Sequence, residues 1–368
     1  MQRFDCARCG VLISFEDPAC PACGDGLAYR PDLLALVNAS TDDGALLAGW
    51  HPCAERSWGC NWLVRDEDDN PRCDACRLNR KTPPRDDTIG WEQLARAAVA
   101  KRRLVHQLKD LGLPITGYHD RPDGGLAFDL LSSATSGQRV VIGHANGVIS
   151  VDLAESTDAH RESVRVWLDE AYRTMLGHFR HEIGHYYWQV LIPGTRWEQP
   201  FRALFGDERA SYSEALQRHY RRDPGRPPTP EFITPYASSH PWEDFAEIWA
   251  HYLHITDTLQ TAVQHSLFPD PRRAESQGRA HLDFDVEDIG DLIEVWTGFA
   301  GSFNELNRSM GKPDPYPFTL SPPVVGKLGF VHALVQDARG GARPFEVCAA
   351  TGPGEDSSGE ASPVGPVQ

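Results

Sequence analysis

The segment HFRHEIGHYYW, residues 178–188, decides how this sequence is interpreted. His181 and His185 lie four residues apart, so a helix places both imidazoles on one face, where they can reach the same metal ion. Glu182 lies beside this pair and can hydrogen-bond a metal-bound water without itself binding the metal. The pattern predicts a catalytic zinc site with Glu182 as the general base. A chance match is the alternative, and the long helical pattern around the motif argues against it.

A catalytic zinc needs a third protein ligand and an open position for water. The segment SHPWEDFAE, residues 239–247, offers Glu243 and Glu247, which point the same way when they lie four residues apart on a helix. One can bind zinc while the other hydrogen-bonds a ligand imidazole. Acidic residues also suit the first turn of a helix, so a structural role is the alternative. His240 is an alternative ligand, and His178 lies one turn before the motif.

Stabilisation of the negative charge that develops in the transition state requires one more group. Tyr236 and His251 are the candidates, because both lie close to Glu243 in the sequence. Core packing is the alternative role for both side chains. The strand expected at 148–151 could offer its backbone to an extended peptide.

The apolar periodicity predicts a mainly helical region with a small sheet. We expect helices over 91–111, 161–191, 208–220, 242–264 and 286–310, and strands at 140–142 and 148–151 around a turn at 144–147. Gly112 is expected to end the first helix. Lys101 and Arg102 fall between the apolar positions of that helix, as is typical of an amphipathic helix.

Eight of the nine cysteines lie within the first 76 residues. Cys-x-x-Cys turns direct two sulfurs at one ion, and two such turns close a tetrahedral four-thiolate site. Two groups follow from the spacing: Cys6, Cys9, Cys20 and Cys23, and Cys53, Cys60, Cys73 and Cys76. We predict a structural zinc ion in each. Iron in place of zinc and redox use of the pairs are the alternatives, and Cys348 is expected to be an ordinary thiol.

The net charge of −16 disfavours nucleic acid and anionic membrane surfaces as partners. The Cys-rich region has the same bias, since residues 1–90 carry 10 basic and 15 acidic side chains. We therefore expect this region to bind a protein partner or to stabilise the fold through its metal sites. No apolar run is long enough to span a membrane, and the polar start with two cysteines is unlike a signal peptide, so we expect a cytoplasmic protein with reduced thiols.

The two motifs together resemble the gluzincin metallopeptidases, in which HExxH is followed on another helix by ExxxD or ExxxE. This resemblance implies that Glu243 is the third zinc ligand and that Glu247 is the supporting residue beyond it. Glu247 stands where many gluzincins have Asp.

Longer strings resemble a bacterial family that has an N-terminal zinc-ribbon region followed by a zinc-binding metallopeptidase domain. They are CNWL at 60–63, CRLNR at 76–80, KRRL at 101–104, LGLP at 111–114, YRTMLGHFRHEIGHYYW at 172–188, FGDER at 205–209 and YASSHPWEDFAEIWAHYLHI at 236–255. Composition and pattern, together with this resemblance, predict an α+β chain in three parts. These are a Cys-rich zinc-ribbon-like region at 1–85, a mainly helical zincin-like metallopeptidase domain with a small sheet at 86–345, and a disordered tail at 346–368.

The leading hypothesis is hydrolysis of a peptide or protein substrate by a zinc-activated water, with one catalytic and two structural zinc ions. The main alternative is a zinc-stabilised protein-interaction module in which the HExxH site is not catalytic. A structural site of that kind would be closed by a fourth protein ligand, such as His240 or His178. Hydrolysis of a non-peptide amide is a second alternative.

Overall fold

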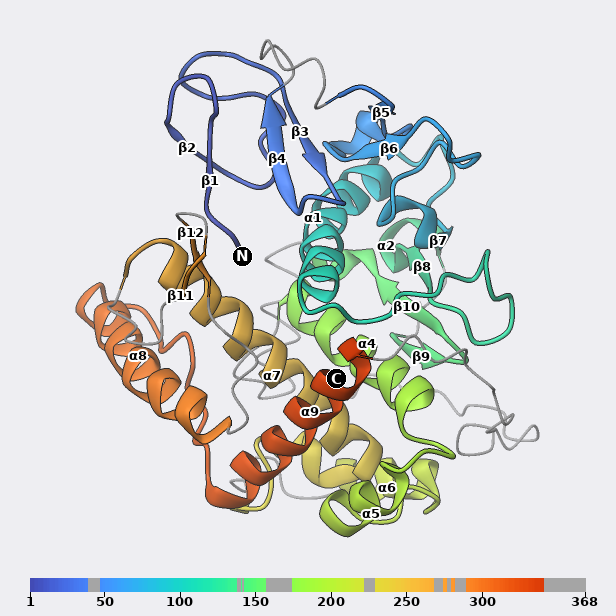
Figure 1. Ribbon diagram of the computed structural model, residues 1–368. Helices are drawn as coiled ribbons and strands as arrows, with labels where there is room; N and C mark the ends of the chain where they lie inside the picture. The colour runs from blue at the N-terminus through green and yellow to red at the C-terminus, as the bar shows by residue number, and fades with distance from the viewer. Residues whose placement is uncertain are drawn as a thin grey trace.

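The computed structural model of the protein describes residues 1–38, 47–137, 140, 142–156, 174–221, 229–267, 274–276, 279–281 and 289–340. Short strand pairs form a Cys-rich head, the described residues of 1–78, at one end of the molecule (Figure 1). Helices and one small sheet form the remainder, so the chain has the predicted α+β architecture. The predicted tail with Cys348 and the first part of the helix expected at 161–191 lie outside the described residues.

The head is built from three antiparallel strand pairs. They are β1 (Phe4–Asp5) with β2 (Leu12–Ile13), β3 (Leu27–Arg30) with β4 (Ala35–Asn38), and β5 (Trp50–Pro52) with β6 (Leu63–Arg65). Pairs this short are marginal alone. Phe15, Tyr29 and Trp62 fill the space between them, with ring centroids 4.4–6.2 Å apart. Tyr29 Oη also lies 2.6 Å from His106 Nδ1, so the head packs directly on the next helix.

One four-stranded sheet lies beyond the head. Its order is β7 (Asn79–Lys81), β8 (Ala127–Leu131), β10 (Val148–Asp152) and β9 (Gly143–Ala145), with only β9 antiparallel to its neighbour. The strand predicted at 148–151 is confirmed as β10, but it lies inside the sheet, and β9 forms the edge. Of the strand predicted at 140–142, Val140 and Ile142 lie outside any strand, and position 141 lies outside the described residues. Asn146 and Gly147, with φ of +45° and +83°, make a two-residue hairpin turn that leaves 143–145 to pair.

Helix α1 (Thr88–Asp110) confirms the helix predicted at 91–111. Asp87 caps its first turn by accepting a hydrogen bond from Gly90 N, and Gly112 follows its end with φ +66°. The polar face expected for this helix is only partly present, because Lys101 and Arg102 are 0% and 2% exposed. Both the head and other helices pack against α1, so more than one face of the helix is buried. The periodicity of the apolar residues predicts only one buried face.

Helices α4 (Met175–Leu191) and α7 (Pro241–Gln264) pack against each other and carry the two sequence motifs. The helix predicted at 242–264 is confirmed, with Pro241 at its first position and His240 as its N-cap. A Cβ added at Gly184 would lie 3.0 Å from Ala246 Cα and 3.1 Å from Trp249 Cβ. Gly184 therefore allows the two helices to approach closely.

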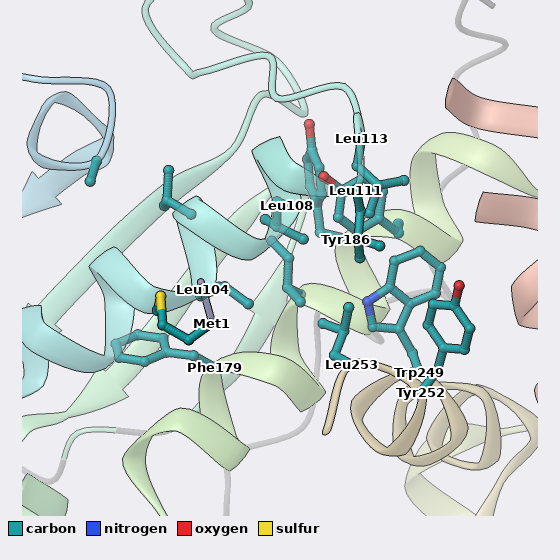
Figure 2. Close-up of a cluster of buried hydrophobic side chains, with 14 of the residues drawn as sticks. Met1, Leu104, Leu108, Leu111, Leu113, Phe179, Tyr186, Trp249, Tyr252 and Leu253 are labelled. Carbon is teal, nitrogen blue, oxygen red and sulfur yellow. The ribbon is translucent and has the colours of Figure 1, made fainter. Parts of the chain in front are cut away.

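The hydrophobic core is continuous from the head to the last helix. Figure 2 shows the part where α1, α4 and α7 meet, with Leu104 and Leu108 next to Phe179, Tyr186, Trp249 and Leu253. All six side chains are buried. This packing holds the motif helices in a fixed relation to α1.

The remaining elements complete the described structure. They are α2 (Ser133–Ser136), α5 (Glu198–Phe205), α6 (Tyr212–Tyr220), α8 (Ile289–Ser309), α9 (Pro322–Gly340), β11 (Ala274–Ser276), β12 (Arg279–His281) and the 3-10 turns η2 (Arg56–Trp58), η3 (Cys76–Leu78), η4 (Leu153–Ser156) and η5 (Tyr236–Ser239). Helix α8 confirms the prediction for 286–310, whereas α5 and α9 were not predicted.

The helix expected from Glu208 begins only at Tyr212. Ser211 caps α6, and Glu208 lies outside it, paired with Arg202 of α5 at 2.5 Å. The prediction therefore placed Glu208 inside the helix, whereas it lies before the first turn. None of the helices in the described ranges is both long and apolar enough to cross a membrane.

Candidate metal centre

Helices α4 and α7 bring three predicted ligands together. His181 Nε2 lies 3.0 Å from Glu243 Oε2, His185 Nε2 lies 3.4 Å from the same oxygen, and the two ring nitrogens are 3.2 Å apart. A tetrahedral zinc ion with bonds of 2.0–2.1 Å to nitrogen would separate its ligand atoms by about 3.3 Å. The donor types and their spacing therefore fit zinc.

Glu247 supports this group from the next turn of α7. Its Oε1 atom lies 2.8 Å from His181 Nδ1, and its Oε2 atom accepts a hydrogen bond from Thr234 Oγ1 at 2.7 Å. A carboxylate on Nδ1 fixes the orientation of the ring, so that Nε2 faces Glu243. Glu247 lies where the sequence motif predicted a supporting residue, whereas Thr234 was not predicted.

Tyr212 holds the other oxygen of Glu243. Its hydroxyl donates to Glu243 Oε1 at 2.5 Å, which leaves Oε2 directed at the two histidines. Burial raises the pKa of Glu243, but the charge on His185 and the hydrogen bond from His181 outweigh burial and hold this pKa well below its usual range. The carboxylate is therefore ionised and oriented before any ligand binds.

Glu182 lies beside the histidine pair on α4 and is 7% exposed. Burial raises the pKa of its carboxyl group above the usual value, and positive charge on His181 and His185 opposes that shift. A carboxyl group whose pKa moves toward neutrality is suited to accept and return a proton.

Aromatic side chains cover one side of the group. The Trp242 ring packs on the His185 ring with centroids 3.9 Å apart. His144, from the edge strand β9, lies with its ring centroid 6.3 Å from that of His185. The edge of the sheet is therefore next to the histidine pair.

The two competing histidines have other contacts. His240 Nδ1 accepts a hydrogen bond from Trp242 N and so caps α7. Its Nε2 atom lies 3.1 Å from Ala210 O, in the segment just before α6. Both ring nitrogens are therefore engaged. His178 Nε2 lies 3.7 Å from a carboxylate oxygen of Glu155. In the described residues, neither belongs to the ligand group.

Tyr236 and His251 are placed differently from each other. The Tyr236 ring centroid lies 6.0 Å from that of His181, at the side of the metal group. His251 is buried and its Nδ1 atom lies 2.8 Å from Tyr316 Oη, on the side of α7 that faces the chain after α8. Of the two predicted candidates, only Tyr236 has its ring against a predicted ligand.

The cysteines gather in the two predicted groups, and none of those in the described residues forms a disulfide. Sulfur atoms lie 3.6–3.8 Å apart for Cys9 and Cys20, Cys6 and Cys23, Cys60 and Cys73, and Cys60 and Cys76. A tetrahedral ion with bonds near 2.3 Å would separate its sulfurs by about 3.8 Å. Both groups fit a zinc ion bound by four thiolates.

The two cysteine groups differ in their surroundings. In the first group, Cys9 is exposed and Cys23 half-buried, and Asn38 donates a hydrogen bond to Cys6 Sγ at 3.2 Å. In the second group all four cysteines are buried, and Cys73 N donates to Cys53 Sγ at 3.3 Å. The second group also leads within three residues into β7 of the main sheet.

Comparison with known proteins agrees with these two regions. Residues 90–334 match a family described as "putative zinc-binding metallo-peptidase", and residues 3–87 match a zinc-ribbon domain. Three proteins named as uncharacterized, one from Mycobacterium bovis and two from strains of Mycobacterium tuberculosis, are each 43% identical over 344 residues, which covers 92% of this chain and 96% of theirs. No solved structure matches the chain.

Proposed function

Because the chain belongs to this family of zinc-binding metallopeptidases and carries a zinc-ribbon domain before the peptidase region, we propose that it hydrolyses peptide bonds. His181, His185 and Glu243 would hold the catalytic zinc. The observation that carries this proposal is the mutual spacing of 3.0–3.4 Å between their three donor atoms, with Glu182 alongside.

Zinc, when bound, supplies a Lewis acid that polarises the substrate carbonyl and lowers the pKa of a water. Glu182 is the general base: a carboxylate oxygen takes the proton of the attacking water and later returns it to the leaving amine. Glu247 and Thr234 keep His181 in one orientation, and Tyr212 keeps Glu243 in one orientation. These contacts pre-organise the ligands, so that little rearrangement accompanies the reaction.

Tyr236 is the better placed of the two predicted groups for stabilising the transition-state charge. Its ring lies against His181, whereas His251 hydrogen-bonds Tyr316. A phenol hydroxyl is a suitable donor for a developing oxyanion.

We propose that the substrate is an extended peptide that adds to the edge strand β9. This strand pairs only on its β10 side in the described sheet, and its His144 lies next to His185. Backbone hydrogen bonds to a sheet edge give affinity without demanding a particular sequence. The head would stabilise the fold or bind a protein partner. The described cysteines form no disulfides, which is consistent with the expected cytoplasmic location.

A closed structural site is the main competing function, and it needs a fourth protein ligand. The group formed by the described residues has three, and both ring nitrogens of His240 are engaged elsewhere. This favours a site that keeps a position for water.

The decisive test is Glu182→Gln in the full-length protein. We expect the variant to retain its zinc, measured by metal analysis, and to lose about 10²–10⁴-fold in kcat/KM toward peptides found by proteome-wide cleavage profiling. Glu294→Gln, an exposed change on α8, is the matched control and should leave both quantities unchanged. Undiminished cleavage by Glu182→Gln, or loss of its zinc, would remove Glu182 from the assigned role.

A further inference from the structure

Two cationic side chains are buried in the middle of α1. Lys101 is 0% exposed and Arg102 is 2% exposed. A buried charge is strongly unfavourable unless an opposite charge lies close to it. An arginine does not lose its charge inside a protein, so Arg102 in particular needs a counter-charge.

No carboxylate of the described residues provides that charge. Lys101 Nζ donates to Ala75 O at 2.8 Å and to Asn79 Oδ1, and Arg102 Nη2 donates to Gly59 O at 3.2 Å. The Nε and Nη1 atoms of Arg102 are buried and have no hydrogen-bond partner in the described structure. Neither side chain forms an ion pair with a carboxylate in the described part of the chain.

The partners of both cations lie in the loops that carry the second cysteine group. Ala75 lies between Cys73 and Cys76, and Gly59 directly precedes Cys60. Burial lowers the pKa of Lys101, and negative charge on Cys76 and Cys73 opposes that shift. The negative charge that acts on Lys101 therefore comes from this cysteine group, and Arg102 hydrogen-bonds the residue next to Cys60.

We propose that Lys101 and Arg102 are the built-in counter-charges of a divalent ion bound by Cys53, Cys60, Cys73 and Cys76. A divalent ion and four thiolates carry a net charge of −2, which one lysine and one arginine neutralise. A trivalent ion would leave a net buried charge of +1, and four neutral thiols would leave +2. The charge balance thus selects zinc or ferrous iron over ferric iron in this group.

Among the described residues, the first cysteine group has no buried lysine or arginine of this kind. Its side-chain donor is the neutral amide of Asn38, and its sulfurs include the exposed Cys9. Water can solvate a doubly negative centre there, so no cation is required. The two groups therefore provide an internal comparison within one molecule.

Zinc release from the full-length zinc-loaded protein tests the proposal, with a chromogenic chelator as the probe. We expect Lys101→Met and Arg102→Met to release one zinc about 10–100-fold faster than the wild type, while zinc bound to the first group leaves at its normal rate. Arg96→Met, an exposed change on the same helix, is the control. Release from the second group at the wild-type rate in both variants would overturn the proposal.

Iron-loaded wild-type protein gives a second test that needs no variant. Burial alone favours the ferric centre, which has the smaller charge, so the buried second group should then be oxidised by ferricyanide before the first. The counter-charges reverse this order and keep the second group ferrous longest. Mössbauer spectroscopy monitors the oxidation state of the two iron centres. Oxidation of the second group before the first would contradict the proposal. Neither test depends on peptide hydrolysis, so the proposed function can stand or fall separately.

Discussion

The two four-cysteine groups have the same donors and opposite surroundings. The first lies in the head, with one cysteine exposed and one half-buried, and an amide is its side-chain donor. The second is buried, lies on the loops that Lys101 and Arg102 hydrogen-bond, and is followed by β7 of the main sheet. This difference indicates that the structural role of each metal ion depends on which part of the fold its cysteine loops are connected to. An ion in the second group would hold part of the peptidase region, whereas an ion in the first would hold a local turn.

Substitution of one cysteine in each group should give the largest contrast. Cys76→Ser is expected to remove most of the stability of the whole chain, on the order of 5–15 kcal/mol for a domain, because the loop it anchors starts β7. Cys9→Ser should leave the peptidase region folded, since the hydrogen bonds of the Cys6–Gly10 turn stay within the head among the described residues. Circular dichroism and hydrogen exchange of α4 measure both. Equal hydrogen-exchange protection of α4 in the two variants would contradict this prediction.

Metal removal sharpens the same contrast without mutation. Incubation of the native protein with EDTA at neutral pH should lower the zinc content from about three to about one ion per chain, because the first group and the candidate catalytic site are less enclosed than the second. Mass spectrometry under native conditions counts the ions, and alkylation of the freed thiols identifies the group. Early labelling of Cys60 or Cys73 would contradict this expectation.

A smaller effect is expected where β7 joins the sheet. Arg80 Nη2 lies 2.6 Å from Asp129 Oδ2 of β8, and Lys81 Nζ lies 3.3 Å from the same oxygen. Burial raises the pKa of Asp129, but the hydrogen bond and charge of Arg80 outweigh it, so the pKa is lowered. Asp129→Asn should reduce the free energy of unfolding by about 1 kcal/mol in urea titrations, since one partner is partly exposed.

The pH dependence of that difference follows from the sign of the shift. A lowered folded-state pKa gives stability that is present above the unfolded-state pKa near 4 and is lost as the pH falls through the folded value. The difference between Asp129→Asn and the wild type should therefore be constant from pH 6 to pH 8. Arg80→Met in a double-mutant cycle is the control, and a difference that changes in this range would show that another group is responsible.

Local rules accounted for the features that depend on neighbouring residues. Helix spacing put His181 and His185 on one face, and Gly112 ended α1 as expected. The approach of Glu243 depends on how α4 and α7 pack, and the family resemblance supplied that expectation, because residue spacing alone left it open. Long-range contacts were not predictable: Tyr212 and Thr234 have no motif that links them to the metal group.

The burial of Lys101 and Arg102 is the most informative miss. Charged residues between apolar positions predict a solvated face, and that rule assumes that only one side of the helix is covered. Here the anion that makes their burial tolerable comes from cysteines far away in the sequence. The error in β9 has a local cause instead, since the Asn146-Gly147 turn was taken as four residues long when it has two.

Gly184 lies between the two histidines in the sequence and packs closely against α7, so it helps to set the distance between the helices that supply the predicted ligands. A Cβ added at Gly184 would lie 3.0 Å from Ala246 Cα and 3.3 Å from Ala246 O, so a side chain there would meet main-chain atoms that cannot rotate away. A methyl group there would push the helices apart by a few tenths of an ångström. That is a sizeable part of the difference between a zinc–nitrogen bond and a calcium–oxygen bond, about 2.0–2.1 Å against 2.3–2.6 Å. If the proposed site holds zinc, the absence of a side chain at Gly184 would favour that small ion.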